Sequence, residues 1–430
     1  MMSAVPTTPR PGLPSKLLRV LILLAISVFI NYIDRGNLSI AAPMIKDELG
    51  LSASQLGILL SAFFWTYASF QLISGWLVDR FNVNWVMAAG FFLWSVATAA
   101  TGTVHAFYVL FAVRLILGMG ESVAYPSYSK ILAQHFPEEH RGFANSLIAA
   151  GLVSGPGFGM LMGGMLMARF GWRSFFLGVG IVSLLWLVPW LRWMPKQPSI
   201  IRLEQIEALS VAQFARLRSA WGTCAGLFCS NYLSYFLITW LPFYLVRERH
   251  YSLPGMAKIG GAAYLLAALA STLSGWLSDR WISRGGTPTL VRKLFTGGGL
   301  AGAGIALAVC GLGGRSLSLA MLMLVTIGFG ICSSNIWAIT QTLAGPQAAG
   351  RWTGMQNFVG NLAGVAAPAI TGFVLDRTGN FIWPFALATT VALLGAAAWF
   401  FLLGPVEQVA WEAREDGLGL VESGSLAPEE

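Results

Sequence analysis

The sequence predicts an all-α membrane protein, with twelve transmembrane helices arranged as two pseudo-symmetric six-helix halves. Hydrophobic residues make up 56% of the 430 positions and charged residues only 11%, against roughly 25% charged in a typical soluble domain. Twelve apolar stretches are long enough to cross ~30 Å of hydrocarbon as helices. The heptapeptide SGWLVDR, which ends the second stretch, returns as SGWLSDR at the end of the eighth. Composition therefore indicates a bilayer protein, and the repeat indicates duplication.

The first stretch is longer than the hydrophobic region of a signal peptide and has no small-residue cleavage pattern behind it. We therefore interpret it as a retained helix. The remaining stretches follow one another through mostly short loops. The predicted spans cover residues 16–40, 55–79, 83–103, 106–130, 145–168, 174–194, 219–246, 257–279, 293–313, 316–341, 353–375 and 381–403.

The longest polar loop, 195–218, separates six spans from six and is predicted to be a cytoplasmic linker. The chain then divides into an N-terminal tail (1–15), an N-terminal bundle (16–194), a C-terminal bundle (219–403) and an acidic tail (404–430). Of the 27 Lys and Arg residues, two lie inside spans; with a cytoplasmic N-terminus, 17 of the others fall inside and 8 outside. This bias predicts that both termini are cytoplasmic.

The same bias accounts for the net charge of +8, so we do not interpret that charge as a nucleic-acid footprint. All four cysteines, Cys224, Cys229, Cys310 and Cys332, fall within predicted spans and lack the spacing of a metal site. We expect no disulfide framework, metal or cofactor. A glycine-rich segment at 297–304 lacks the strand–turn–helix context of a nucleotide site. A membrane-embedded enzyme or a sensor is therefore disfavoured.

Fainter copies of the repeated heptapeptide end spans five (163–170, GGMLMARF) and eleven (371–378, TGFVLDRT), on the side predicted to face outside. A motif at spans 2, 5, 8 and 11 with alternating side suggests four three-helix units, inverted within each half. Such an arrangement places a binding site at the membrane midplane, between two rocking halves. Helix caps and positive-inside anchoring would explain the arginines of the motif but not its register.

The two strong copies resemble the loop signature of the major facilitator superfamily. In that signature a glycine permits close helix approach, an aspartate sits against the N-terminus of a helix from the opposite half, and an arginine meets carbonyls or a carboxylate. We therefore assign the motif to gating rather than to substrate. The predicted gating residues are Gly75, Asp79 and Arg80, with Gly275, Asp279 and Arg280 in the second copy.

Four ionisable residues lie deep inside spans, where they are costly and usually functional. Asp34 and Arg35 are on span one, and Arg114 and Glu121 on span four. Arg114 and Glu121 are seven residues apart, so they share one helix face two turns apart. Gly118 and Gly120 between them would let a neighbour such as span one approach. The proton affinity of a carboxyl group rises on burial and falls beside an arginine, so the two acids are predicted to carry protons.

We expect Arg35 to anchor a substrate anion through paired hydrogen bonds, while Arg114 tunes the two acids. A plain salt-bridge staple between spans one and four is the alternative. Neutral polar residues extend the predicted binding surface, although interhelical hydrogen bonding or interfacial anchoring would also explain them. These residues are Tyr32 on span one, Tyr67 and Gln71 on span two, Asn231, Tyr235 and Trp240 on span seven, Ser334, Trp337 and Gln341 on span ten, and Asn357 and Asn361 on span eleven.

Five segments resemble the anion:cation symporter branch of that superfamily: YIDRGNLS, AFFWTY, RLILGMGESVAYP, TWLPFYL and QNFVGNLAG. The resemblance covers about 16–403 and implies a proton-coupled symporter that imports a sugar-acid-like monocarboxylate across a bacterial inner membrane, by alternating access. It also implies that Asp34 and Glu121 bind protons, with Arg114 as counter-charge, and that Arg35 holds the substrate carboxylate. Tyr32, Tyr67, Ser334, Trp337 and Asn357 would line the pocket.

Two departures from that branch matter. Leu152 stands where galactonate-like members place a polar Gln, and the segment GLVSGPGFG (151–159) is similar to an element of proton-coupled antiporters. A proton-coupled exporter of organic anions or drug-like compounds is therefore the alternative. A second arginine in span seven, typical of vesicular carriers, is absent, which favours a monoanion. The expected partners are a small organic anion, protons and the lipid bilayer, and we expect a monomer.

Overall fold

The computed structural model describes residues 14–136, 138–194 and 211–409. Every regular element in this part of the chain is a helix, which confirms the all-α prediction. The first half contains α1 (Ser15–Glu48), α2 (Ala53–Arg80), α3 (Val83–Thr101), α4 (Phe107–Ser122), α5 (Ala124–His135), α6 (Glu138–Phe158), the π-helical turn η1 (Gly159–Gly163), α7 (Gly164–Leu184) and α8 (Leu187–Trp193). The second half contains α9 (Val211–Arg216), α10 (Arg218–Arg247), α11 (Leu253–Ser283), α12 (Pro288–Lys293), η2 (Leu294–Gly298), α13 (Gly299–Leu312), α14 (Arg315–Thr378), α15 (Ile382–Ala397) and η3 (Ala398–Leu402).

The twelve predicted spans are all present as helix. Ten helical stretches in the described part of the chain are long and apolar enough to cross a membrane. One of these, Ala150–Trp193, holds two predicted spans, because the chain turns at Gly171, where φ is 79°. The remaining span is α2, which is 28 residues long. A left-handed Gly345, with φ of 64°, likewise divides α14 into spans ten and eleven. Both turns need a residue without a Cβ.

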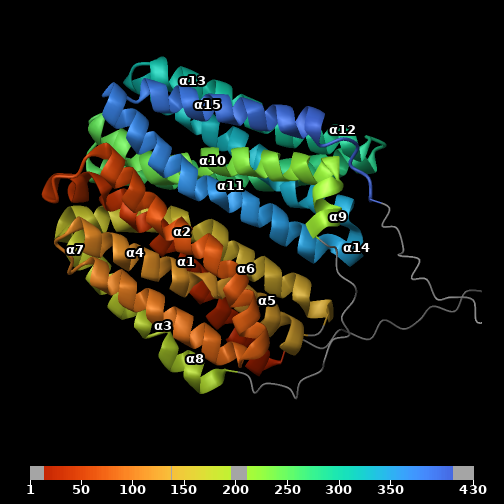
Figure 1. Cartoon of the computed structure of the whole chain (residues 1–430), viewed down its shortest axis with the longest axis horizontal. Helices are drawn as coiled ribbons and strands as arrows, with labels where there is room; N and C mark the ends of the chain where they lie inside the picture. Colours follow the sequence, from red (N-terminus) through yellow and green to blue (C-terminus); the bar gives the residue numbers. More distant parts are fainter. Residues whose placement is uncertain (1–13, 137, 195–210, 410–430) are drawn as a thin grey trace, which may run out of the picture.

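The helices form two groups that lie side by side with roughly parallel axes, as Figure 1 shows. The α1–α8 group lies below the α10–α15 group in that view. Three sets of helices join the groups: α1 packs on α10, α2 on α14, and α11 on α6, η1 and α7. The predicted linker and the two tails lie mostly outside the described residues; of the linker, only 211–218 is described.

Glycines allow the closest of these approaches between the halves. A Cβ on Gly57 of α2 would stand 2.5 Å from the carbonyl oxygen of Pro368 on α14, and one on Gly164 of α7 would stand 2.5 Å from the Cβ of Ala257 on α11. A real Cβ does not fit at such distances, so the backbone of α2 lies directly against that of α14, and the backbone of α7 lies against the Ala257 methyl group of α11. Large apolar side chains such as Trp76, Val188 and Leu265 are exposed on the outside of the bundle, as a lipid-facing surface requires.

Span one differs from its predicted bounds. The helix continues past residue 40 to Glu48 and includes Pro43. Residues 41–48 therefore extend the helix beyond the apolar stretch, toward the end of the bundle that we predict to face outside. We call this end, which holds Glu48 and the N-terminus of α2, the outer end; the opposite end, which holds Arg80 and Arg280, is the inner end.

Candidate functional site

A cavity of about 390 Å³ lies between the two halves. From the first half, Tyr32, Arg35 and Arg114 reach it, and from the second half Trp337 does. These are four of the residues predicted for the site. Leu152 also lines the cavity, so the position where galactonate-like proteins place a Gln presents only an apolar side chain here.

The Arg35 side chain is almost buried, with 13% of its surface exposed, and it is paired on one side only. Its Nε donates a hydrogen bond to Glu121 Oε2 at 3.1 Å, while its Nη2 has no hydrogen-bond partner in the part of the chain that the structure describes. The guanidinium also faces the rings of Tyr32 and Tyr67, with Cζ 4.6 Å and 4.4 Å from the ring centroids. Aromatic rings attract a cation and leave its in-plane donors free. Arg35 is therefore oriented by its surroundings yet able to take a further acceptor.

Local helix geometry explains this arrangement. Tyr32 and Arg35 are three residues apart on α1 and share one face, while Asp34 lies on the neighbouring, fully buried face. Gly118 of α4 would place a Cβ 2.3 Å from the carbonyl oxygen of Phe63, so α4 packs directly on α2 there. The expectation that the glycines of span four admit span one is therefore wrong in detail, because Gly118 faces α2 and Gly120 faces Trp94 of α3.

The other two buried charges are close to this pair. Asp34 is 1% exposed and accepts a hydrogen bond from Asn37 Nδ2 at 3.4 Å. Arg114 is 3% exposed, with Cζ 5.4 Å from the centroid of Phe63, and it faces both Asp34 and Glu121. No hydrogen bond or ion pair holds Arg114 among the described residues. Two acids and two bases are thus gathered beside the cavity, and one ion pair, Arg35–Glu121, joins α1 to α4.

Several predicted pocket residues lie behind the cavity wall rather than on it. Tyr67 is 4% exposed and supports Arg35 from behind. Ser334 accepts hydrogen bonds from Ser274 Oγ and Asn335 Nδ2, both at 2.8 Å, within the α11–α14 contact. Gln71 and Asn357 are also outside the set of residues that line the cavity. Their assignment to substrate stays a prediction.

The second half lines the cavity with polar residues, and only some of them were predicted from the sequence. Ser333 faces the cavity in place of its neighbour Ser334, because one residue turns a helix by about 100°. The spacing of polar residues in the sequence could have predicted the lining of α10 and α11. The positions that line the cavity recur every three, four and seven residues, which is the spacing of one helix face. The polar side chains at these positions are Asn231, Ser234, Tyr235 and Thr239 on α10 and Tyr264 and Ser271 on α11. Trp240 is fully buried and donates to Pro368 O instead.

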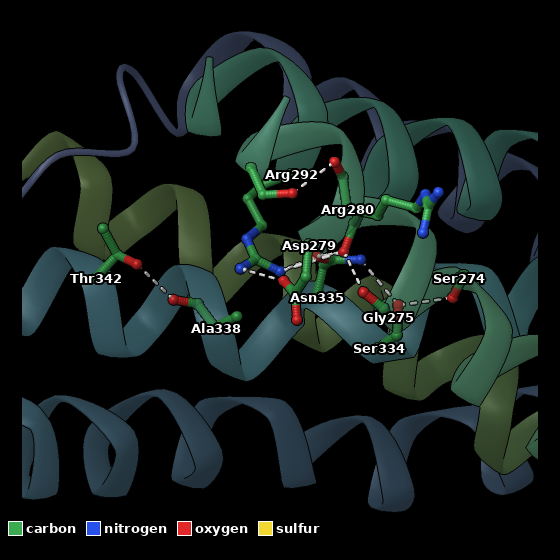
Figure 2. Close-up of polar contacts among 11 residues, drawn as sticks. Ser274, Gly275, Asp279, Arg280, Arg292, Ser334, Asn335, Ala338 and Thr342 are labelled. Atoms are coloured by element: carbon green, nitrogen blue, oxygen red, sulfur yellow. Dashed lines mark hydrogen bonds and ion pairs between the residues drawn. The ribbon is translucent and has the colours of Figure 1, made fainter. Parts of the chain in front are cut away.

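The gating motif of the second half forms contacts within that half. Asp279 Oδ1 accepts a hydrogen bond from Arg292 Nη2 at 2.9 Å, and Arg292 also bonds to Asn335 (Figure 2). Arg280 points away from this cluster, with Cζ 5.2 Å from the ring centroid of Trp276. A Cβ on Gly275 would stand 3.8 Å from Ser334 Cβ of α14, an ordinary contact, so the close helix approach predicted for this glycine is not present. In the first copy, Gly75 has open space beside it and Arg80 is exposed, while the Asp79 side chain lies outside what the structure describes.

The contact predicted for the strong motif copies is present at a weak one. Asp376, in the span-eleven copy, accepts hydrogen bonds from the backbone N–H groups of Ala53 at 2.7 Å and Ser54 at 2.6 Å, at the N-terminus of α2. Arg247 of α10 adds an ion pair to Asp47 and a hydrogen bond to Pro43 O at 3.1 Å. Both contacts cross between the halves at the outer end. We call these two contacts between the halves the outer latch.

Comparison with known proteins decides the family. Residues 24–368 match the sequence profile of the Major Facilitator Superfamily. The chain belongs to this superfamily. It is 30% identical over 400 residues to a probable sulfoacetate transporter of Cupriavidus necator, covering 89% of this chain and 93% of that protein. It is 29% identical to a hexuronate transporter of Bacillus subtilis, covering 90% and 95%.

The solved structures of a bacterial homologue of the human lysosomal transporter Spinster share the fold of this superfamily member. In its inward-facing and occupied conformation that homologue has a TM-score of 0.78 at 20% identity, over 91% of this chain and 97% of that one. The predictions of a major facilitator fold and of a transporter rather than an enzyme are confirmed. The cavity between its two halves is the candidate transport site.

Proposed function

We propose that this transporter imports a sugar-acid-like organic monocarboxylate together with protons, by alternating access, across a bacterial inner membrane with both termini in the cytoplasm. The observation that carries the proposal is Arg35, a largely buried cation on the wall of the central cavity that is paired with Glu121 and with no other anion among the described residues. The relatives that share this fold include proteins named for hexuronate, galactarate or D-glucarate, and sulfoacetate transport. All of these compounds carry an acidic group.

The proposed cycle exchanges the partner of Arg35. Facing outside, protonation of Asp34 and Glu121 releases Arg35 from its internal ion pair, and the guanidinium binds the substrate carboxylate through Nη2 and a second N–H. Facing inside, the substrate leaves, the acids lose their protons and the Arg35–Glu121 pair reforms. The two conformations thereby differ in their affinity for both proton and anion, which is what couples the two fluxes.

A polar surface in the second half would bind the neutral part of the solute. Asn231, Ser234, Tyr264 and Ser271 face the cavity from α10 and α11, opposite Arg35 and Arg114. Hydroxyl and amide side chains suit a polyol tail, because each can donate and accept hydrogen bonds. Trp337, which is 39% exposed, adds an aromatic face to the same wall. Tyr32 and Tyr67 hold Arg35 in place.

The alternative, in which the buried charges form only a structural salt bridge between α1 and α4, explains fewer of these observations. The Arg35–Glu121 pair does join α1 to α4. A purely structural salt bridge, however, does not explain why Arg35 lies on the cavity wall with its Nη2 unpaired. It also leaves Arg114 without a role, because this second cation is buried at the cavity without a hydrogen-bond partner among the described residues.

Export by antiport is the second candidate, and it rests on the Gly-Pro element of α6. Pro156 does line the cavity. The neighbouring glycines, however, have a packing role: a Cβ on Gly155 would stand 2.7 Å from Tyr32 Cβ, and one on Gly151 would stand 2.9 Å from Ala25 O. Close contact between α6 and α1 therefore explains the glycines without antiport.

Uptake into proteoliposomes tests the proposal. With the outside acidified, the wild-type protein should accumulate a labelled sugar acid, and Glu121→Gln should lose this accumulation while exchanging internal for external substrate at a rate within about threefold of wild type. Gln keeps the size of Glu but cannot carry the proton. Efflux driven by the same gradient would instead establish the antiporter. Unchanged pH-driven accumulation in both Glu121→Gln and Asp34→Asn would refute the proton roles.

A further inference from the structure

A second cavity, of about 80 Å³, adjoins the central cavity. We call it the side pocket. Every residue that lines it is buried or half-buried, so it lies inside the bundle rather than on the lipid-facing surface. The two cavities are continuous along one wall, because five residues line both of them: Ser234 and Ile238 of α10, Tyr264 and Ala267 of α11, and Phe329 of α14.

The side pocket lies on the outer side of the central cavity. On α11, which runs toward the inner end, Ala263 of the side pocket precedes Ser271 of the central cavity by eight residues. On the first part of α14, which runs in the same direction, Thr326 precedes Ser333 by seven. Seven or eight residues of helix rise by about 10–12 Å. The side pocket therefore lengthens the binding space by about two helical turns.

The deep wall of the side pocket is mainly apolar. Thr326 belongs to this wall, but it already donates its hydroxyl to Met323 O at 2.9 Å, within its own helix. A buried water needs two to four polar partners, so this wall suits a hydrocarbon group better than a water or a hydroxyl. The other residues that line the side pocket but not the central cavity are Met160, Leu237, Leu241 and Ala263.

Met160 closes the side pocket from the other half of the molecule. It belongs to η1 in the first half, whereas the rest of the lining is on α10, α11 and α14. Its side chain is 3% exposed and lies on Gly260 of α11, where a Cβ would overlap the Met160 Cγ. Methionine is flexible and fills irregular gaps. The Met160 side chain therefore limits how long a group the side pocket can hold.

The size of the side pocket fits a small group. Cavities of about 10–15 Å³ hold a single water, so 80 Å³ has room for several non-hydrogen atoms. The central cavity already provides Arg35 for an acidic group, and Asn231 and Ser271 for hydroxyl groups. What the side pocket adds is a place for an apolar end.

We propose that the side pocket is a specificity pocket for the end of the solute that lies away from the carboxylate. The preferred anion is then a hydroxy acid that ends in a methyl or short alkyl group, rather than in the hydroxymethyl group of an ordinary sugar acid. Ala263 and Met160 set the length of that group. This inference rests on the proposed function and narrows its substrate class.

Competition against uptake of labelled D-gluconate or D-galactonate into proteoliposomes tests the inference. Each unlabelled acid is paired with its deoxy analogue, in which a methyl group replaces the terminal hydroxymethyl, and with the homologue that ends in an ethyl group. Ala263→Leu fills the side pocket, and Met160→Ala enlarges it. The matched control is Ala262→Leu, which adds the same bulk at the neighbouring, exposed position of α11.

We expect the deoxy analogues to compete with the wild type at about tenfold lower concentration than the parent acids, because a hydroxyl buried without a partner is costly. Ala263→Leu should abolish this preference, and Ala262→Leu should keep it. Met160→Ala should improve the ethyl homologue by about fourfold relative to the methyl analogue, as expected for one more buried CH₂ group.

Equal competition by parent acids and deoxy analogues in the wild type would overturn the inference, and so would a preference that Ala263→Leu leaves unchanged. If Ala263→Leu fails to fold, Met160→Ala decides, and the same methyl-to-ethyl ratio as in the wild type would overturn the inference. A wild type that takes up neither labelled acid under an inward proton gradient would instead overturn the proposed function, so the two failures are distinguishable.

Discussion

Arg35 takes its properties from the three groups that surround it. Tyr32 and Tyr67 cover its faces, and Glu121 occupies Nε while Nη2 stays free. A planar guanidinium fits this site because it can stack on rings and still present two parallel donors to a carboxylate. A lysine ammonium carries the same charge but offers neither the plane nor the paired donors.

Arg35→Lys is therefore expected to raise the KM for the transported anion by about tenfold or more, about 1.4 kcal/mol of lost binding. Initial rates of labelled uptake in proteoliposomes measure this. The control is Arg173→Lys, whose ion pair with Glu48 at 2.7 Å lies at the outer end, away from the cavity. Equal KM values for the two variants would contradict the anchoring role.

The charged residues of the site could be predicted from sequence because they stand alone among apolar neighbours. A charge inside a span can be recognised without knowing how the helix is rotated about its axis. The four such residues, Asp34, Arg35, Arg114 and Glu121, lie together in the structure. Neutral residues were harder to assign, since their role depends on the rotation of a helix about its axis. Ser333 and Ser334 differ by one position, yet one faces the cavity and the other bonds to Ser274.

At the scale of the helices, the aspartates of the repeated motif make different contacts in the different copies. In this conformation the Asp279 copy bonds to Arg292 of its own half, whereas the Asp376 copy caps α2 of the other half. The capping contact is strong because it joins a carboxylate to the exposed N–H groups and positive dipole of a helix N-terminus. Sequence alone indicated the register of the copies but not which of them would be engaged, since that depends on the conformational state.

Asp376→Asn should loosen the outer latch. Loss of the charge at two N–H contacts is expected to cost about 1–2 kcal/mol, which shifts the conformational equilibrium toward the outward-facing state by roughly 5- to 30-fold. Spin labels at the exposed inner-end positions 81 and 284 should then report a larger population of short distances between the halves.

Thr378→Val is the control for this variant, because its hydroxyl bonds only to Val374 O and Asn380 O in its own segment. A distance distribution that is identical in Asp376→Asn, Thr378→Val and wild type would show that the contact at α2 does not hold the outer end closed.

At the scale of the whole molecule, the charge and the polar surface are divided between the halves. The first half carries the four buried charges, and the second half lines the same cavity with neutral hydroxyl, amide and aromatic groups. At the outer end the halves are joined by close helix contacts at Gly57 and Gly164 and by the two charged contacts of the outer latch. The proposed alternating access requires a rocking motion that breaks these contacts.

The central claim is that an arriving anion replaces Glu121 at Arg35 and that a proton compensates the displaced carboxylate. Proton exchange during binding to the purified protein in weakly buffered detergent solution tests it most directly, with a pH indicator as readout and the sugar acid as ligand. The account predicts net proton uptake when the wild type binds the anion, and little or none in Glu121→Gln at comparable occupancy. Saturating binding by the wild type with no proton taken up would contradict it.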